Sequence, residues 1–179
     1  LLSSSLSPRI NNRKDKWGGS FENRARLLQL ILQKVRESVG NNFILAVKIN
    51  SSDFQKGGLE ISDSVKIANL IEKENIDFIE VSGGNFEAPE AYQYVSLKES
   101  TKSREAYFLD AAKNIKASVS IPIMVTGGFR SISVMEDALT SSSTDLIGIG
   151  RPFVIDPSFP YKLLNGDISV LPAVERNFP

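Results

Sequence analysis

Two glycine turns, each directly after a short apolar run, are the parts of this chain best suited to chemistry. The run 121–126 leads into Gly127-Gly128, and a second run leads into Gly150-Arg151. Glycine lets backbone N–H groups approach an anion closely, and oriented N–H groups at a turn attract phosphate. In a (β/α)8 barrel, the loops after the last two strands form the usual phosphate site. The pattern therefore predicts the phosphate-binding quarter of such a barrel.

A lysine interrupts a third apolar run, 43–49, at Lys48. Three roles are open for this side chain. Its ammonium can extend from a strand end into water. Its amine can form a Schiff base with a carbonyl substrate. Its charge can also stabilise negative charge that develops on a bound ring.

Composition narrows the class of protein. The chain has 179 residues, of which 41% are hydrophobic and 23% charged, which is typical of one ordinary globular domain. The net charge is zero, so neither nucleic acid nor an anionic membrane is an expected partner. No apolar run approaches the roughly 18 residues of a membrane span. Cysteine and histidine are absent, which excludes disulfides and imidazole chemistry within the chain, and we expect no metal site.

Strand and helix signals alternate along the chain. Strands are expected near 43–49, 77–82, 121–126 and 145–149. Three helices are expected at Ser20–Gly40, Arg104–Ile115 and Tyr161–Asn165. Two more are expected to begin at an N-cap, one at Ser62 and one at a capping box of Ser133 and Glu136. Such alternation predicts a parallel sheet with right-handed crossovers. Four strands cannot close an eight-stranded barrel. We therefore interpret residues 1–179 as a single partial domain, the second half of an α/β barrel and a segment of a longer protein.

Seven ordered blocks of residues carry a family resemblance. They are the stretch from Ser7-Pro8 to Arg24, which includes Gly18-Gly19-Ser20, then Lys48-Ile49-Asn50, Asp53, Val81-Ser82-Gly83-Gly84, Arg104 to Phe108, Thr126 to Arg130, and Gly148 to Pro152. In this order the blocks resemble the old yellow enzyme family of FMN-dependent NADH:flavin oxidoreductases and NADH oxidases. The resemblance runs from Leu1 to about Asp167. It implies strands five to eight of a (β/α)8 TIM barrel.

The resemblance also implies an activity and a set of binding residues. FMN would be reduced by NADH or NADPH and would pass hydride to an electron-poor alkene in the cytoplasm. Gly128 and Phe129 would offer backbone N–H groups to the FMN phosphate, and Gly150 and Arg151 would do the same after the last strand. Lys48 would lie beside flavin N1 and the C2 carbonyl, which favours the third of its roles.

The chain departs from the family pattern at two places. Trp17 stands where the family usually has tyrosine. The family's His-x-x-His or His-x-x-Asn motif and its nearby tyrosine, which bind the substrate carbonyl and supply a proton, would lie before Leu1. The resemblance therefore places no catalytic residue within this chain.

Several other polar and aromatic residues have structural interpretations. The charged and amide side chains of Asn11, Arg13, Asp15, Glu22 and Arg24 are expected to pin the loop that enters the first helix. The aromatic residues Phe86, Tyr92 and Tyr94 either line a substrate mouth or pack within their loop. The carboxyls of Asp53 and Glu80 are expected near strand ends, without an assigned partner or proton-transfer role.

Three functional hypotheses remain at this point. The chain is half of an FMN-dependent ene-reductase or NADH oxidase-like enzyme. It is alternatively a non-catalytic fragment or pseudoenzyme that serves as an interaction module or pairs as two half-barrels. A third hypothesis is another phosphate-binding barrel enzyme that uses Lys48 covalently. The expected partners are a small electron-poor alkene and, at the protein level, a second copy or the missing half.

Overall fold

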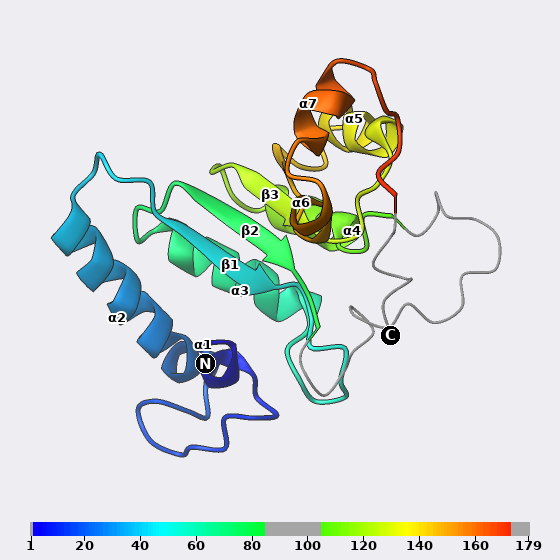
Figure 1. Ribbon diagram of the computed structural model, residues 1–179. Coiled ribbons are helices and arrows are strands. Elements are labelled where there is room, and N and C mark those ends of the chain that lie inside the picture. Colours follow the sequence, from blue (N-terminus) through cyan, green and yellow to red (C-terminus); the bar gives the residue numbers. More distant parts are fainter. Residues whose placement is uncertain (1, 85–104, 173–179) are drawn as a thin grey trace.

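The structure is a computed structural model that describes residues 2–84 and 105–172 (Figure 1). Strands alternate with helices along the chain, as the sequence predicts. The elements in chain order are α1 (Leu2–Leu6), α2 (Phe21–Val39), β1 (Ala46–Asn50), α3 (Ile61–Glu72), β2 (Phe78–Ser82), α4 (Leu109–Lys116), β3 (Ile123–Thr126), α5 (Ile132–Thr140), β4 (Leu146–Gly148), α6 (Arg151–Ile155) and α7 (Phe159–Leu164).

The strands form one parallel sheet in the order β1-β2-β3-β4. Lys48 pairs in register with Glu80 across β1 and β2, and Thr126 pairs with Gly148 across β3 and β4. Parallel neighbours need a crossover, so each connecting helix returns the chain to the same starting edge. The carboxyl ends of all four strands therefore lie together. The predicted α/β half-barrel architecture is confirmed.

One face of the sheet builds the core. Alternate strand residues point toward the helices and are buried, namely Val47, Ile49, Ile79, Val81, Ile123 and Val125. They pack in one cluster with helix residues such as Leu28, Ile67 and Ile115. Full burial of such a side chain stabilises a fold by about 1.5–3 kcal/mol. Figure 1 shows α3 and α4 behind the sheet, so that the viewer looks onto the opposite face.

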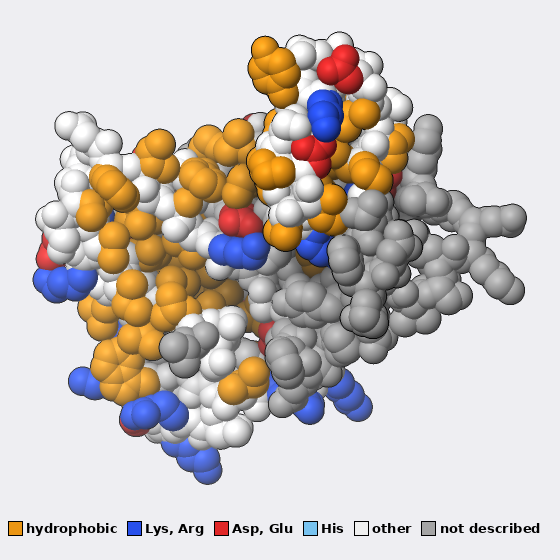
Figure 2. Space-filling view, in the orientation of Figure 1, with side chains coloured by type: hydrophobic (Ala, Val, Ile, Leu, Met, Phe, Trp, Pro, Cys, Tyr) orange, Lys and Arg blue, Asp and Glu red, His pale blue; other side chains and the backbone are white. Residues whose placement is uncertain are grey.

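That opposite face is open in this segment. Ala46, Lys48 and Leu146 are exposed on it, and Figure 2 shows hydrophobic side chains gathered over β1 and β2 in the same view. An almost continuous apolar run such as 43–49 is typical of a strand buried on both faces, but here it is buried on one face only. The difference has a simple cause, because the open face is the one that would point into the interior of a closed barrel. Phe43, which is 61% exposed, precedes the strand instead of starting it.

The ends of the longest helix follow the sequence signals. Ser20 Oγ accepts a hydrogen bond from the Asn23 N–H at 3.3 Å, and Gly40 ends the helix with a φ of 74°. Both predicted boundaries of α2 are thus confirmed. Gly40 suits this place because its backbone adopts positive φ without a Cβ clash.

Three other helix starts differ from prediction. The cap of α3 is Glu60 and not Ser62, and the Glu60 N–H donates to Asp63 Oδ2 at 3.4 Å. The helix α5 starts after Ser131, so Ser133 lies inside it and forms no capping box with Glu136.

The helix α4 begins only at Leu109, because the four residues before it are used to contact the neighbouring turn. The short helices α1 and α6 lacked a recognisable signal.

The N-terminal segment is pinned by the polar residues that were interpreted as structural. Arg24 Nε donates to the Leu6 carbonyl at 2.8 Å, and its Nη1 donates to the Gly19 carbonyl at 2.6 Å. Asn11 Nδ2 donates to the carbonyls of Ser5 and Trp17. These bonds hold the chain against the start of α2, which confirms the structural role. Within the described part of the chain, no helix is long and apolar enough to cross a membrane.

Candidate functional site

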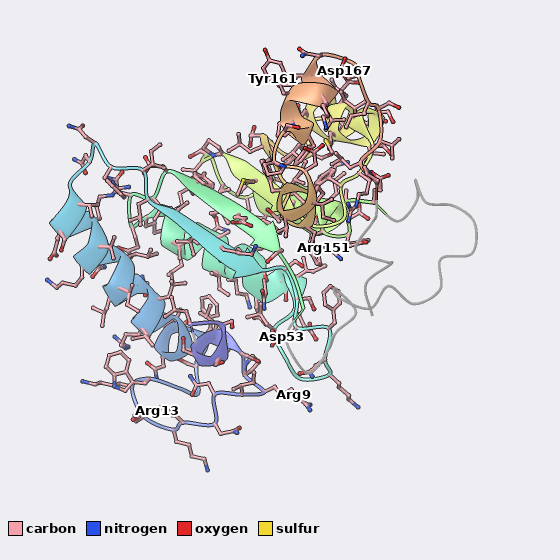
Figure 3. The ribbon with its side chains drawn as sticks, viewed as in Figure 1. Arg9, Arg13, Asp53, Arg151, Tyr161 and Asp167 are labelled. Carbon is pink, nitrogen blue, oxygen red and sulfur yellow. The ribbon has the colours of Figure 1, made fainter. Side chains whose placement is uncertain are left out.

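The two predicted glycine turns lie at the same edge of the sheet. Thr126, the last residue of β3, is the register partner of Gly148, the last residue of β4. Gly127-Gly128 and Gly150 therefore follow neighbouring parallel strands at their carboxyl ends. Figure 3 shows Arg151 on the side of the molecule to which the strand arrows point. This is the edge at which parallel α/β folds place their ligands.

The turn after β3 needs glycine. Gly127 has a φ of 145° and Gly128 a φ of 83°, conformations that side chains with a Cβ rarely adopt. A Cβ on Gly127 would lie 2.8 Å from the Phe108 ring, and one on Gly128 would lie 2.8 Å from the Tyr107 ring. The two aromatic rings therefore cover the turn closely. The next residue, Phe129, is 3% exposed and anchors the turn to the core.

The turn after β4 has more room. Among the described residues, no atom would lie within 4 Å of a Cβ on Gly150. Gly150 is followed by α6, in which Arg151 is exposed and Pro152 is buried. The two turns thus combine a tightly held backbone on one side with an open approach and a cation on the other. A phosphate group requires both features, close N–H donors and positive charge.

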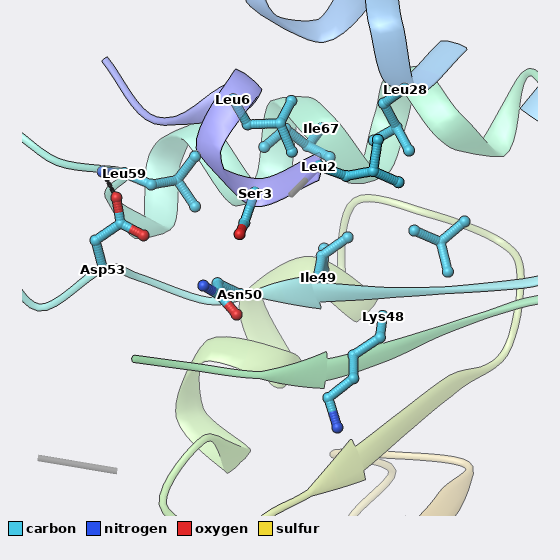
Figure 4. Close-up of a pocket in the computed structure, with 11 residues that line it drawn as sticks. Leu2, Ser3, Leu6, Leu28, Lys48, Ile49, Asn50, Asp53, Leu59 and Ile67 are labelled. Atoms are coloured by element: carbon cyan, nitrogen blue, oxygen red, sulfur yellow. Dashed lines mark hydrogen bonds between the residues drawn. The ribbon is translucent and has the colours of Figure 1, made fainter. Parts of the chain in front are cut away.

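Lys48 projects from β1 onto the open face of the sheet. In Figure 4 it points away from Ile49, toward the side opposite the apolar core. Its Nζ lies 2.6 Å from Glu80 Oε1, and the side chains of Lys48 and Glu80 are 54% and 20% exposed. Glu80, which had no assigned partner, therefore has one. The signal was present in the sequence, because the alternation within the predicted strands puts both residues on one face.

Asp53 is a structural carboxylate. It is 2% exposed, and its Oδ2 accepts hydrogen bonds from Ser7 Oγ at 2.6 Å and from the Leu59 N–H at 2.9 Å. These bonds tie the N-terminal segment to the loop after β1. Burial of a carboxylate is costly unless such donors are supplied. The sequence missed this contact because Ser7 and Asp53 are far apart in the chain.

A pocket of about 200 Å³ opens beside β1, at the edge that no described strand pairs (Figure 4). Its walls are mostly apolar and include Leu6, Leu28 and Ile67. Because β1 and β4 are the two outer strands of the described sheet, the pocket lies on the β1 side, away from β3 and β4. It is therefore separate from the two glycine turns.

Three of the carboxylates with lowered pKa values lie at the other end of the sheet. Hydrogen bonds from Ser120 lower the pKa of Glu72, and the Leu45 N–H and Arg36 lower that of Asp77. Burial opposes the shift at Asp145, but Lys116 and the Ile123 N–H bring its pKa below its ordinary value. Asp77 and Asp145 directly precede β2 and β4, and Glu72, at the end of α3, contacts Ser120 before β3. This end of the sheet is thus a stabilising network, away from the predicted binding edge.

Two further points concern the aromatic residues predicted at a substrate mouth and the side chains that could bind a metal. Phe86, Tyr92 and Tyr94 lie outside the described residues. Among residues 2–84 and 105–172, no group of three or more His, Cys, Asp and Glu side chains could hold a metal ion.

Comparison with known proteins adds three findings. The model of the NADH:flavin oxidoreductase / NADH oxidase family matches residues 1–167. The NADH-dependent flavin oxidoreductase iliE of Neonectria sp. (strain DH2) is 37% identical over 169 residues, which cover 89% of this chain. A 2-naphthoyl-CoA reductase structure superposes with a TM-score of 0.83 at 32% identity over 96% of this chain.

A more distant structure supports the fold alone. The old yellow enzyme homologue from Zymomonas mobilis superposes with a TM-score of 0.72 at 20% identity and covers 98% of this chain. The chain spans only part of each of these proteins. It covers 22% of the Neonectria relative, 26% of the reductase and 46% of the Zymomonas protein.

Proposed function

The chain belongs to the NADH:flavin oxidoreductase / NADH oxidase family, and on that premise we propose that it forms the C-terminal half of an FMN-dependent oxidoreductase. When bound, FMN supplies the ring that accepts hydride from NADH or NADPH and delivers it to an alkene conjugated with a carbonyl. One observation carries the proposal. The two glycine turns follow adjacent parallel strands at one edge of the sheet.

The proposed phosphate site consists of Gly128, Phe129, Gly150 and Arg151. Its first support is the tight turn after β3, where Gly127 and Gly128 have positive φ at the carboxyl end of the strand. Its second is the open space beside Gly150 and the exposed guanidinium of Arg151. A charged donor strengthens a hydrogen bond to phosphate well beyond a neutral one. The residues present therefore fit a phosphomonoester such as that of FMN.

Lys48 is proposed to hold its cation beside the flavin ring. Its place on the open face supports this role, because that face would line the interior of the closed barrel. The rival Schiff-base role would require the amine to leave Glu80, 2.6 Å away. Borohydride treatment in the presence of a carbonyl substrate tests the rival directly, since only a Schiff base leaves a stable adduct at Lys48.

The substrate carbonyl and the proton are proposed to be handled by residues outside this chain. The 179 residues contain no histidine, and so supply no imidazole donor. We assign these roles to the part of the barrel that would precede Leu1. The open face of the sheet and the unpaired edge of β1 are the surfaces that this other half would cover. In the interaction-module hypothesis, a second copy would cover them instead.

The experiment uses the full-length polypeptide. Purified protein should be yellow, release FMN on denaturation, and bleach on addition of NADH or NADPH without oxygen. Arg151→Ala should weaken FMN binding about ten- to a hundredfold, the range expected for one charge-assisted contact. Arg26→Ala, which removes an exposed arginine from α2, is the matched control and should leave affinity unchanged. A colourless protein with no affinity for FMN would favour the interaction-module hypothesis.

A further inference from the structure

The segment Glu105–Phe108 contacts the glycine turn after β3 along its whole length. Tyr107 and Phe108 place their rings where a Cβ on Gly128 or Gly127 would be. The Phe108 ring also lies 2.6 Å from the position that a Cβ on Gly83 would occupy, after β2. The segment thus bridges the ends of two neighbouring strands, β2 and β3.

Glu105 holds this turn through its carboxylate. Its Oε2 accepts hydrogen bonds from the backbone N–H groups of Arg130 at 2.9 Å and Ser131 at 2.8 Å. Its Oε1 accepts a third from Ser131 Oγ at 2.7 Å. The bonded residues come directly after Gly127-Gly128-Phe129 and lead into α5. The carboxylate therefore fixes the chain at the point where the turn ends.

The backbone beside Glu105 is strained. Ala106 has a φ of 55° and is 7% exposed. A left-handed conformation is unfavourable for alanine, and such strain persists only where surrounding contacts demand it. Here the contacts are visible on both sides of Ala106. They are the Glu105 carboxylate on the α5 start and the Tyr107 ring on Gly128.

Two glycines in succession make a flexible turn, because glycine loses more conformational freedom on ordering than any other residue. A ligand that binds a flexible turn loses affinity, because part of its binding free energy is used to order the turn. Contacts within the protein that order the turn beforehand avoid this loss. The carboxylate itself repels phosphate, so Glu105 cannot serve by attraction. Its contribution is geometric, and its charge is balanced by the N–H groups at the start of α5.

We propose that Glu105 is a positioning residue of the phosphate site, which keeps the Gly127–Phe129 turn in its binding geometry before FMN arrives. This inference rests on the proposed function, because it takes FMN phosphate as the ligand of that turn. It gives Glu105 a role in FMN affinity, which neither the family match nor the glycine motif indicates.

The test compares FMN dissociation constants in the full-length polypeptide, by quenching of FMN fluorescence. Glu105→Ala should weaken binding about ten- to a hundredfold, since two or three hydrogen bonds that order the turn are lost. Glu105→Gln should stay within about threefold of the parent, because an amide oxygen can accept the N–H groups and the amide NH2 can donate to Ser131 Oγ. Rescue by glutamine separates positioning from charge.

Glu72 offers a matched control. Its carboxylate accepts from the Ser120 N–H at 2.7 Å and from Ser120 Oγ at 2.6 Å, so it makes the same kind of contact at the opposite end of β3. Glu72→Ala should lower the free energy of unfolding and leave FMN affinity unchanged. Should Glu105→Ala fail to fold, Ser131→Ala removes only the hydroxyl contact and should weaken FMN about threefold to tenfold.

The outcomes separate the two proposals. FMN affinity that survives Glu105→Ala or Ser131→Ala but falls in Arg151→Ala overturns the role of Glu105 alone. Affinity that survives all three substitutions overturns the phosphate site itself, and the role of Glu105 with it. A loss in Glu72→Ala as large as in Glu105→Ala would also overturn the inference, because it would reflect general destabilisation.

Discussion

Thr126 at the end of β3 and Gly148 at the end of β4 approach so closely that a Cβ on Gly148 would overlap Thr126 Oγ1. The same Cβ would lie 2.8 Å from the Thr126 Cβ. Within the described residues, Thr126 Oγ1 is buried and makes no hydrogen bond. Glycine at position 148 is thus required by the contact between two strands, directly before both proposed phosphate-binding turns.

Gly148→Ala should therefore destabilise the protein by about 1–3 kcal/mol, the usual cost of overpacking. The change should also move β4 away from β3 and weaken FMN binding. Gly150→Ala is the stability control, because no atom of residues 2–84 and 105–172 would lie within 4 Å of its Cβ. Urea unfolding measures both variants. A second substitution, Thr126→Ala, should recover part of the loss, and equal stability of Gly148→Ala and Gly150→Ala would contradict the close contact.

The order and direction of the strands could be predicted from the sequence, because periodicity and glycine turns are local signals. The run 121–126 and its following glycines illustrate this, since each feature lies within ten residues. The predicted starts of α3 and α5 were wrong, because a local signal was present but was not the one that the structure uses. Ser62 and Ser133 are good local caps, but α3 starts earlier through a capping box of Glu60 and Asp63, and α5 starts earlier where Ser131 is bonded to the distant Glu105.

The contacts that organise the site depend on distant residues and left no local signal. Glu105 and Ser131 are joined by the fold, as are Ser7 and Asp53. The pairing of Lys48 with Glu80 did have a signal, because alternation within the two strands puts both side chains on one face, and the register of β1 on β2 then makes them neighbours. The sequence thus predicts which end of the sheet carries the proposed binding site, whereas the structure identifies the contacts that hold the turns there.

Lys48→Met should make the flavin of the full-length protein harder to reduce, because the negative charge that develops on the ring would lose its cation. Glu80→Gln should shift the midpoint potential in the opposite direction, since Glu80 Oε1 lies 2.6 Å from Lys48 Nζ and offsets its charge. A reductive titration against a reference dye measures both potentials. A potential that Lys48→Met leaves unmoved would remove Lys48 from the proposed mechanism.

The carboxylates at the start of the strands should make the protein acid-sensitive. In the folded state, hydrogen bonds from Ser120 hold the pKa of Glu72 below its ordinary value, and the Leu45 N–H and Arg36 do the same for Asp77. Groups with lowered folded pKa values contribute stability that is fully present above the unfolded pKa and is lost as pH falls through the folded pKa. The free energy of unfolding should therefore fall below about pH 4.

Glu72→Gln tests this assignment, because it removes the charge and keeps the shape. The variant should be less stable than the parent at neutral pH, and the difference should shrink as the pH falls toward 2 and the parent's Glu72 is protonated. Urea unfolding from pH 7 to pH 2 gives both curves. A difference that stays constant over this range would show that the Glu72 charge does not contribute.

The last prediction is that these 179 residues alone will not catalyse alkene reduction with NADH or NADPH. The chain has no histidine, and in the proposed function the residues that bind the substrate carbonyl and supply the proton lie outside this chain. The face that carries Lys48 is open, with that side chain 54% exposed, so a flavin ring held there would remain in water. Exposed apolar surface beside an unpaired strand edge also favours association. Binding of FMN should be weak, mainly through its phosphate.

The test adds FMN and NADPH to the purified segment and follows reduction of a cyclic enone, with the full-length polypeptide as the positive control. Turnover by the segment comparable to that control would show that half of the barrel suffices, and that the missing residues are not needed for the chemistry.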